Sequence, residues 1–277
     1  MSTSKQIFSF GQKVNGSRAP VVSWSHDSSY LAVGTERKYV YIVDKRGKVL
    51  VEKELPVSGR VECIEWDNED EMLAILTEGA TSVLLWAPFT GNLLDELIFE
   101  NQKFKISWLK WSSTHPVLTS GNEKGYLNFY FKKNKRKVPT MGKHSKKVIC
   151  GDWNNEGLLV TGSEDKLITI SNHNSDNAAN SLAVKAEPRD LKWMTMKTEE
   201  RNKKQTTICG VFNQKTLLIH DITQDRSAPL ELMFESKYGK IIDYQFYGDG
   251  YIVVGFSEGY YCHVSTHEKE MKDEIKS

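Results

Sequence analysis

The chain has 277 residues, and its 37 lysines and arginines nearly balance its 36 aspartates and glutamates. A formal net charge of +1 excludes a global field that would recruit nucleic acid or an anionic membrane, so an electrostatic partner must read a local patch. With 39% hydrophobic residues, the chain is expected to fold as a soluble globular protein with a substantial core.

The beginning of the chain, MSTSKQIFSFGQ, lacks the apolar region of a signal peptide. No stretch approaches the roughly 18 apolar residues that span a bilayer. The four cysteines lie far apart without the CxxC or Cys/His spacing of a zinc site, at Cys63, Cys150, Cys209 and Cys262. We expect free, buried thiols in a cytoplasmic, reducing compartment, and no metal or cofactor.

An apolar stretch that ends in tryptophan recurs along the chain. It ends at Trp24, Trp66, Trp111, Trp153 and Trp193, which are 40 to 45 residues apart. A sixth copy ends at Tyr247, after a polar insertion at 197–205. This spacing is typical of a WD-repeat β-propeller, in which each repeat forms one four-stranded blade. The sequence therefore predicts an all-β, WD40-type propeller as a single domain over residues 1–277.

Each tryptophan is followed by a polar turn and two further runs rich in β-branched and aromatic residues. In the first repeat these runs are YLAVGT and YVYIVD, and KVLVEKEL at 48–55 supplies an outer strand. No apolar stripe of helical period persists. Six blades are predicted near residues 19–55, 60–100, 105–138, 147–182, 186–235 and 240–275.

The fourth repeat carries a degenerate WD-repeat signature. GKH at 142–144 stands where such repeats have Gly-His, and GSEDKLITISN at 162–172 stands where they have a turn aspartate followed by Trp-Asp. His144 and Asp165 are therefore expected to pair, but Ser171 at the tryptophan position prevents the full hydrogen-bonded tetrad. The predicted structural residues are Trp24, Trp66, Trp86, Trp111, Trp153, His144 and Asp165.

Taken together, the repeats resemble the N-terminal propeller of the large WD-repeat core subunit of intraflagellar transport complex A. The resemblance extends from about Ile7 to Ile275 and is strongest at 142–172 and 240–267. It implies a non-catalytic scaffold that binds other subunits of a ciliary transport complex, acts in retrograde transport and ciliary entry of membrane proteins, and is located in cytoplasm and cilium. The alternative is a peptide-reading adaptor of another complex, such as a vesicle coat or a ubiquitin ligase.

Eight basic residues and no acidic residue lie between positions 132 and 147. One interpretation is a loop that binds an acidic protein or anionic lipid head groups, and the other is a solvated hairpin. The candidate partner-binding residues are Lys132, Lys133, Lys135, Arg136, Lys137, Lys143, Lys146 and Lys147.

Four acidic residues follow Trp66, at Asp67, Glu69, Asp70 and Glu71. They lack the spacing of an EF-hand and fall at a predicted turn, where we expect them to face solvent. A propeller enzyme would need ligands or carboxylates repeated at one register, and the inner strands PVVSW, VECIEW, ISWLKW and VICGDW share none. We therefore expect no catalytic residue and no small-molecule substrate.

Near the end of the chain, one of Tyr260 and Tyr261 is expected to pack between blades and the other to be exposed, because neighbouring strand residues face opposite sides. Two segments compete as outer strand of the last blade, IFSF at 7–10 and KEMKDEI at 269–275. Two candidates for one position predict that a seventh blade is missing, so that the chain is an N-terminal fragment with an incomplete ring. Exposed strand edges and apolar faces would then favour dimerisation or imperfect closure.

Overall fold

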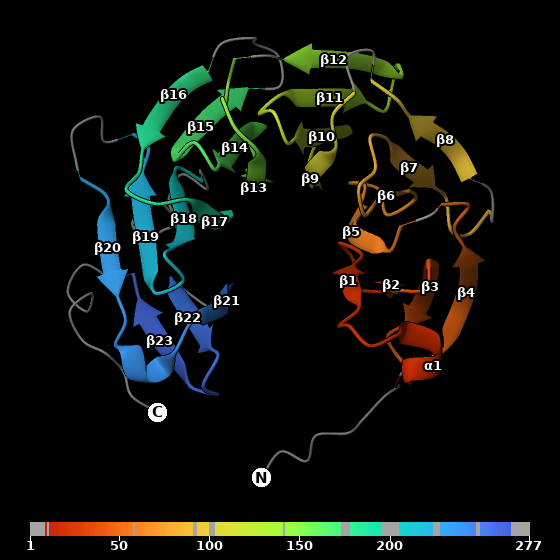
Figure 1. Ribbon diagram of the computed structural model, residues 1–277, viewed down its shortest axis with the longest axis horizontal. Helices are drawn as coiled ribbons and strands as arrows, with labels where there is room; N and C mark the ends of the chain where they lie inside the picture. The colour runs from red at the N-terminus through yellow and green to blue at the C-terminus, as the bar shows by residue number, and fades with distance from the viewer. Residues whose placement is uncertain are drawn as a thin grey trace. The chain divides into compact units, whose positions relative to one another are not determined.

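Six antiparallel sheets make up the computed structural model (Figure 1). It describes residues 9, 11–57, 59–90, 93–99, 103–140, 142–172, 178–194, 205–223, 228–247 and 250–266. Helix is confined there to α1 (Gln12–Asn15) and the short η2 (Ser236–Tyr238), so the all-β prediction is confirmed. Among the described residues, no helix has the length and hydropathy required of a membrane span.

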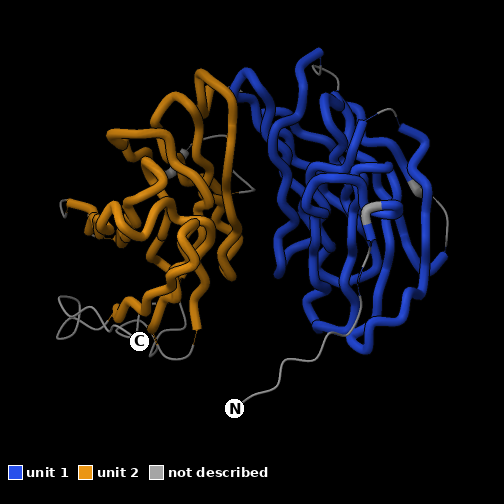
Figure 2. Tube along the Cα trace, turned by 60° about the horizontal axis from the view of Figure 1, so that its bottom comes forward, with its two compact units in different colours: residues 1–141 blue, residues 142–277 orange. Residues whose placement is uncertain are grey.

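The chain forms two compact units, residues 1–141 and residues 142–277 (Figure 2). The first unit holds three sheets, made of β1 (Val21–Trp24), β2 (Tyr30–Gly34), β3 (Tyr39–Asp44) and β4 (Val49–Glu54), then β5 (Val61–Trp66), β6 (Leu73–Thr77), β7 (Val83–Trp86) and β8 (Leu93–Leu97), then β9 (Ile106–Trp111), β10 (Val117–Asn122), β11 (Leu127–Phe131) and β12 (Arg136–Thr140).

The second unit holds the other three sheets. Their strands are β13 (Val148–Trp153), β14 (Leu158–Ser163), β15 (Leu167–Asn172) and β16 (Ala178–Ala183), then β17 (Pro188–Met194), β18 (Thr207–Phe212), β19 (Thr216–Asp221) and β20 (Leu230–Met233), then β21 (Ile241–Tyr247), β22 (Tyr251–Phe256) and β23 (Tyr261–Ser265). Each sheet is one predicted blade, with its strands paired in chain order. The last sheet has three described strands, and both candidates for its fourth strand lie, apart from Ser9, outside the described residues.

The middle strands of the blades are largely buried because both faces of the sheet are covered. All residues of β6 and β7 are buried, whereas exposed and half-buried residues alternate along the last part of β4. Side chains from neighbouring blades share one core, and in the first unit Ile42 of one sheet packs with Trp66 and Ile75 of the next. The blades of a unit are therefore stabilised by one another rather than singly.

Two of the repeated tryptophans, Trp66 and Trp193, form a hydrogen bond to the preceding blade. Trp66 is 1% exposed, and its indole N–H donates to the carbonyl of Ser23 in β1 at 3.1 Å. In the second unit, the indole of Trp193 donates to the carbonyl of Asp152 in β13, also at 3.1 Å. In both pairs the acceptor is the residue just before the tryptophan of the preceding repeat. The indole N–H of Trp111 is buried without a hydrogen-bond partner among the described residues, so not every repeat makes this contact.

The aromatic residues of the first and sixth repeats differ from the predicted pattern. Trp24 belongs to the first blade of its unit, which has no preceding blade there, and it is 51% exposed rather than buried. In the sixth blade the buried aromatic residue is Tyr244 rather than Tyr247, because the hydroxyl of Tyr244 reaches back to donate to the carbonyls of Cys209, at 2.9 Å, and Asp190.

Replacing these tryptophans tests the unequal burial. Trp66→Ala should lower the free energy of unfolding by roughly 3 to 5 kcal/mol, since it removes a buried ring and an inter-blade hydrogen bond. Trp24→Ala should have a far smaller effect. Urea unfolding followed by circular dichroism measures both, and equal losses would contradict the assignment of Trp24 as an uncovered residue.

Candidate interaction surfaces

The predicted basic segment divides between the two units. Residues 132–137 follow β11 in the first unit, and Lys143, Lys146 and Lys147 precede β13 in the second. Exposed side chains of the segment belong to Lys133, Lys135, Arg136, Lys137 and Lys146, and Lys147 is half-buried. Lys143 is buried, because the Gly-His turn in which it lies is folded into the blade, and it is no accessible contact residue.

Lys132 is not a free cation either. Its ammonium lies 2.5 Å from a carboxylate oxygen of Asp67, 2.6 Å from one of Glu69 and 3.1 Å from one of Glu71. All three carboxylates belong to the β5–β6 turn of the preceding blade. The expectation of a basic run without counter-charge is therefore wrong at this position.

The expectation that these acidic residues face solvent is wrong for Asp67. Its side chain is wholly buried, and its second oxygen accepts the backbone N–H groups of Glu71, at 2.9 Å, and Met72, at 3.0 Å. The turn after the first strand and the turn after the third strand lie at the same end of an antiparallel meander. An acidic turn in one blade thus comes within reach of the lysine at the end of the third strand in the next.

The three carboxylates are close enough for metal ligation, with ligand oxygens within 4.8 Å of one another. The Lys132 ammonium already binds all three, so it supplies the positive charge that a cation would bring. Burial alone would lower the pKa of Lys132, but its hydrogen bonds to Asp67 and Glu69 outweigh burial and raise that pKa. The same contact lowers the pKa of Glu69, so Lys132 and Glu69 both stay charged near neutral pH.

Removing Lys132 should destabilise the first unit. Lys132→Met leaves Asp67 buried without its counter-ion and should lower the free energy of unfolding by about 3 to 5 kcal/mol. Adding Asp67→Asn, which keeps the acceptor of the turn, should restore much of that loss. Urea unfolding at pH 7 measures the three proteins, with Lys133→Met as the exposed control. A loss in the control as large as that of Lys132→Met would contradict a specific role for the buried lysine.

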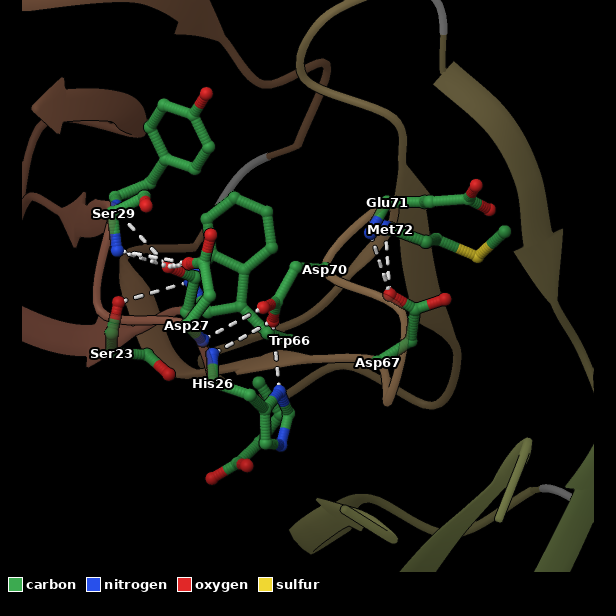
Figure 3. Close-up of polar contacts among 12 residues, drawn as sticks. Ser23, His26, Asp27, Ser29, Trp66, Asp67, Asp70, Glu71 and Met72 are labelled. Atoms are coloured by element: carbon green, nitrogen blue, oxygen red, sulfur yellow. Dashed lines mark hydrogen bonds and ion pairs between the residues drawn. The ribbon is translucent and has the colours of Figure 1, made fainter. Parts of the chain in front are cut away.

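Asp70, the fourth acidic residue, joins the first two blades (Figure 3). One carboxylate oxygen accepts the backbone N–H of His26 at 2.9 Å and contacts its Nδ1 at 2.8 Å, and the other accepts the N–H of Asp27 at 3.1 Å. Figure 3 shows Asp70 directed toward this turn and Trp66 toward Ser23. The acidic turn therefore serves as an inter-blade tie on both sides.

His144 lies in a hydrogen-bonded network inside the fourth blade. Its Nδ1 is 3.3 Å from Asp165, and its Nε2 is 2.9 Å from the hydroxyl of Thr161 and 3.2 Å from that of Thr169. Burial lowers the pKa of His144 although Asp165 opposes the shift, so the imidazole is neutral at pH 7. Ser171 is buried at the tryptophan position, and its hydroxyl has no hydrogen-bond partner within the described chain. The tetrad is thus incomplete, as the sequence predicts.

The cysteines and the tyrosine pair were also singled out from the sequence. Burial raises the pKa of Cys150 to about 12 and also raises that of Cys63 and Cys209, so these thiols stay protonated. Tyr260 and Tyr261 are both exposed, at 53% and 56%, around the start of β23. The ring of Tyr260 contacts that of Tyr238 and the ring of Tyr261 contacts that of His263, but neither contact buries its tyrosine. The expectation that one of them packs between blades is wrong.

Sequence reasoning missed the ion pairs at the position before three of the repeated tryptophans, Trp66, Trp111 and Trp193. Glu65 binds Lys110 at 3.1 Å across the second and third blades, and Lys192 binds Asp243 at 3.2 Å across the fifth and sixth. Glu65, Lys110 and Lys192 all directly precede a tryptophan. The sequence did contain a signal for these pairs, because the residue before the tryptophan carries opposite charges in successive repeats.

Three comparisons place the chain among known proteins. A family model described as the WDR19 first beta-propeller matches residues 20–277. WD repeat-containing protein 19 of Mus musculus is 36% identical over 274 residues, which are 98% of this chain and 20% of that protein. WD repeat-containing protein dyf-2 of Caenorhabditis elegans is 27% identical over 96% of this chain and 19% of its own length. The chain thus spans about one fifth of the length of these relatives.

A solved structure shares the fold. A chain in the crystal structure of a mitotic checkpoint complex superposes with a TM-score of 0.71, covering 88% of this chain and 72% of that one. At 17% sequence identity this likeness shows the WD40-type propeller fold alone.

Proposed function

The chain belongs to the family of WDR19 first β-propellers, and from this membership we propose that it is a non-catalytic scaffold within intraflagellar transport complex A. The family recognised by resemblance in the sequence is thereby confirmed. The observation that carries the proposal is similarity to WDR19 over 98% of the chain. Transport from ciliary tip to base, ciliary entry of membrane proteins and location in the cilium are proposed with it.

The chemistry of the described side chains supports a scaffold over an enzyme. The groups best suited to catalysis are each engaged by partners inside the fold. Lys132 neutralises the carboxylates of the acidic turn, His144 binds two threonines and Asp165, and burial keeps the Cys150 thiol protonated. A hydrolytic site needs such groups open to a substrate.

Affinity purification from ciliated cells tests the proposal. The tagged protein should recover the other subunits of complex A at stoichiometric ratio, and it should be found in the cilium and at its base. Non-ciliated cells are the matched control. Recovery of subunits of a vesicle coat or a ubiquitin ligase at that ratio instead would favour the adaptor alternative and contradict the proposal.

We further propose that the exposed part of the basic segment in the first unit contacts an acidic surface, either of a neighbouring subunit or of an anionic membrane. Its residues are Lys133, Lys135 and Arg136, which are exposed around the β11–β12 turn. Lys137 is set apart from them because its ammonium donates to the carbonyl of Ile98 at 3.3 Å, so that it also joins two blades.

Reversing the three charges to glutamate should weaken this salt-sensitive contact while leaving the melting temperature nearly unchanged, because exposed charges contribute little to stability. The matched control reverses Lys45, Arg46 and Lys48, which are exposed in the corresponding β3–β4 turn of the first blade. Co-purification and binding to vesicles that contain phosphatidylserine measure the effect. Unchanged binding in both assays would contradict the proposal and favour the interpretation of the segment as a solvated hairpin.

A further inference from the structure

An apolar groove lies between the fourth and fifth blades, entirely within the second unit. Its volume is about 520 Å³. One wall is the end of β16 and the connection that follows it, where Ala183, Val184 and Ala186 line the groove. The other wall comes from β19 and β20, the third and fourth strands of the fifth blade. Figure 1 shows this blade beside the fourth blade, to which β16 belongs.

The pairing of β19 with β20 explains the composition of the second wall. Thr216 lies opposite Met233, and Leu218 lies opposite Glu231, so these four side chains share one face of the blade. Thr216 and Leu218 are buried at the base of the groove, whereas Met233 is 77% exposed at its rim. An exposed methionine beside a buried leucine provides an adaptable apolar surface.

The groove exists because a large side chain is missing at a position that other blades fill. After the fourth strand, the backbone N–H of one residue donates to a carbonyl of its blade's second turn, as seen for Leu55 to Lys38, Val184 to Lys166 and Phe234 to Lys215. Leu55 and Phe234 are buried and pack in cores shared with the next blade. Val184 packs against the core shared by the fourth and fifth blades, but it is smaller and only half-buried, and alanines flank the groove around it.

Positive charge borders the groove at one end. A second hollow of about 440 Å³ shares Lys185, Ala186 and Asn213 with it and is also lined by Lys166 and Arg189. Lys185 binds Glu231 at 3.0 Å. Lys166 and Arg189 are exposed and have no carboxylate partner within the described part of the chain. Glu187 is the single acidic residue in this second hollow, so unpaired positive charge is in excess there.

We propose that this groove binds a short peptide segment of a partner protein, with an aliphatic side chain in the apolar part and carboxylates facing Lys166 and Arg189. Burial of one such side chain contributes about 1.5 to 3 kcal/mol, and the two cations select acidic neighbours for it. The proposal rests on the scaffold function for the identity of the partner, but not for the binding itself.

Selection of random 12-residue peptides displayed on phage against the purified 277-residue protein tests this site. Enriched peptides should share an aliphatic residue next to aspartate or glutamate. Their affinity, measured with synthetic fluorescent copies, should fall about tenfold or more in a variant with Ala183→Phe and Ala186→Phe, which fills the groove, and in Lys166→Glu with Arg189→Glu. It should also fall as the salt concentration rises.

The matched control is Lys38→Glu, at the corresponding turn of the first blade, where the backbone is left-handed as it is at Lys166. This control should bind the peptides as the wild type does. Circular dichroism and the melting temperature show that each variant is folded, and Met233→Ala replaces the filling variant if that protein is not. Failure to enrich peptides, enrichment of basic peptides, or equal binding by the groove variants would overturn the proposal. Loss of complex A subunits in the purification with intact peptide binding would overturn only the scaffold function.

Discussion

Each blade of this protein has two apolar faces, and neither face is stable in water. A sheet of four short strands cannot bury both faces by itself, so it must be covered by its neighbours. The interaction that fixes this stacking is the contact of one inner strand with the next, where Trp66 is buried against the preceding blade and donates its indole N–H to Ser23. The same geometry recurs at Trp193 and Asp152 in the second unit, whereas Trp111 is buried without this hydrogen bond.

The charges of the inner strands and turns follow from that stacking. Once the blades are in register, Glu65 meets Lys110, and the acidic turn around Asp67 meets Lys132. An ion pair with a buried carboxylate, as at Asp67, gives little net stability but penalises any other register strongly, since a slipped blade would leave Asp67 charged and unpaired. We interpret these pairs as determinants of blade order, which leaves the exposed charges of the outer turns for partners.

The sequence was sufficient to predict the blades because each carries its own repeat of strand and turn signals. It also predicted the His144 and Asp165 contact, which is local to one blade. It was insufficient for Lys132, whose partners lie 61 to 65 residues away in another blade. Trp24 was predicted to be structural like the other tryptophans, but burial depends on what precedes a blade, and no pattern within a repeat contains that information.

The groove of the second unit follows from the same constraint. Blades that meet closely at their inner strands diverge toward their outer strands, so the space between them must be filled by side chains there. Leu55 and Phe234 fill it at their positions, whereas Val184 with its flanking alanines leaves about 520 Å³ open. A change in size at one residue per repeat thus converts a packed boundary into a binding groove without altering the strands. A scaffold of repeated blades can in this way acquire different partners at different boundaries while the inner contacts that hold it together stay the same.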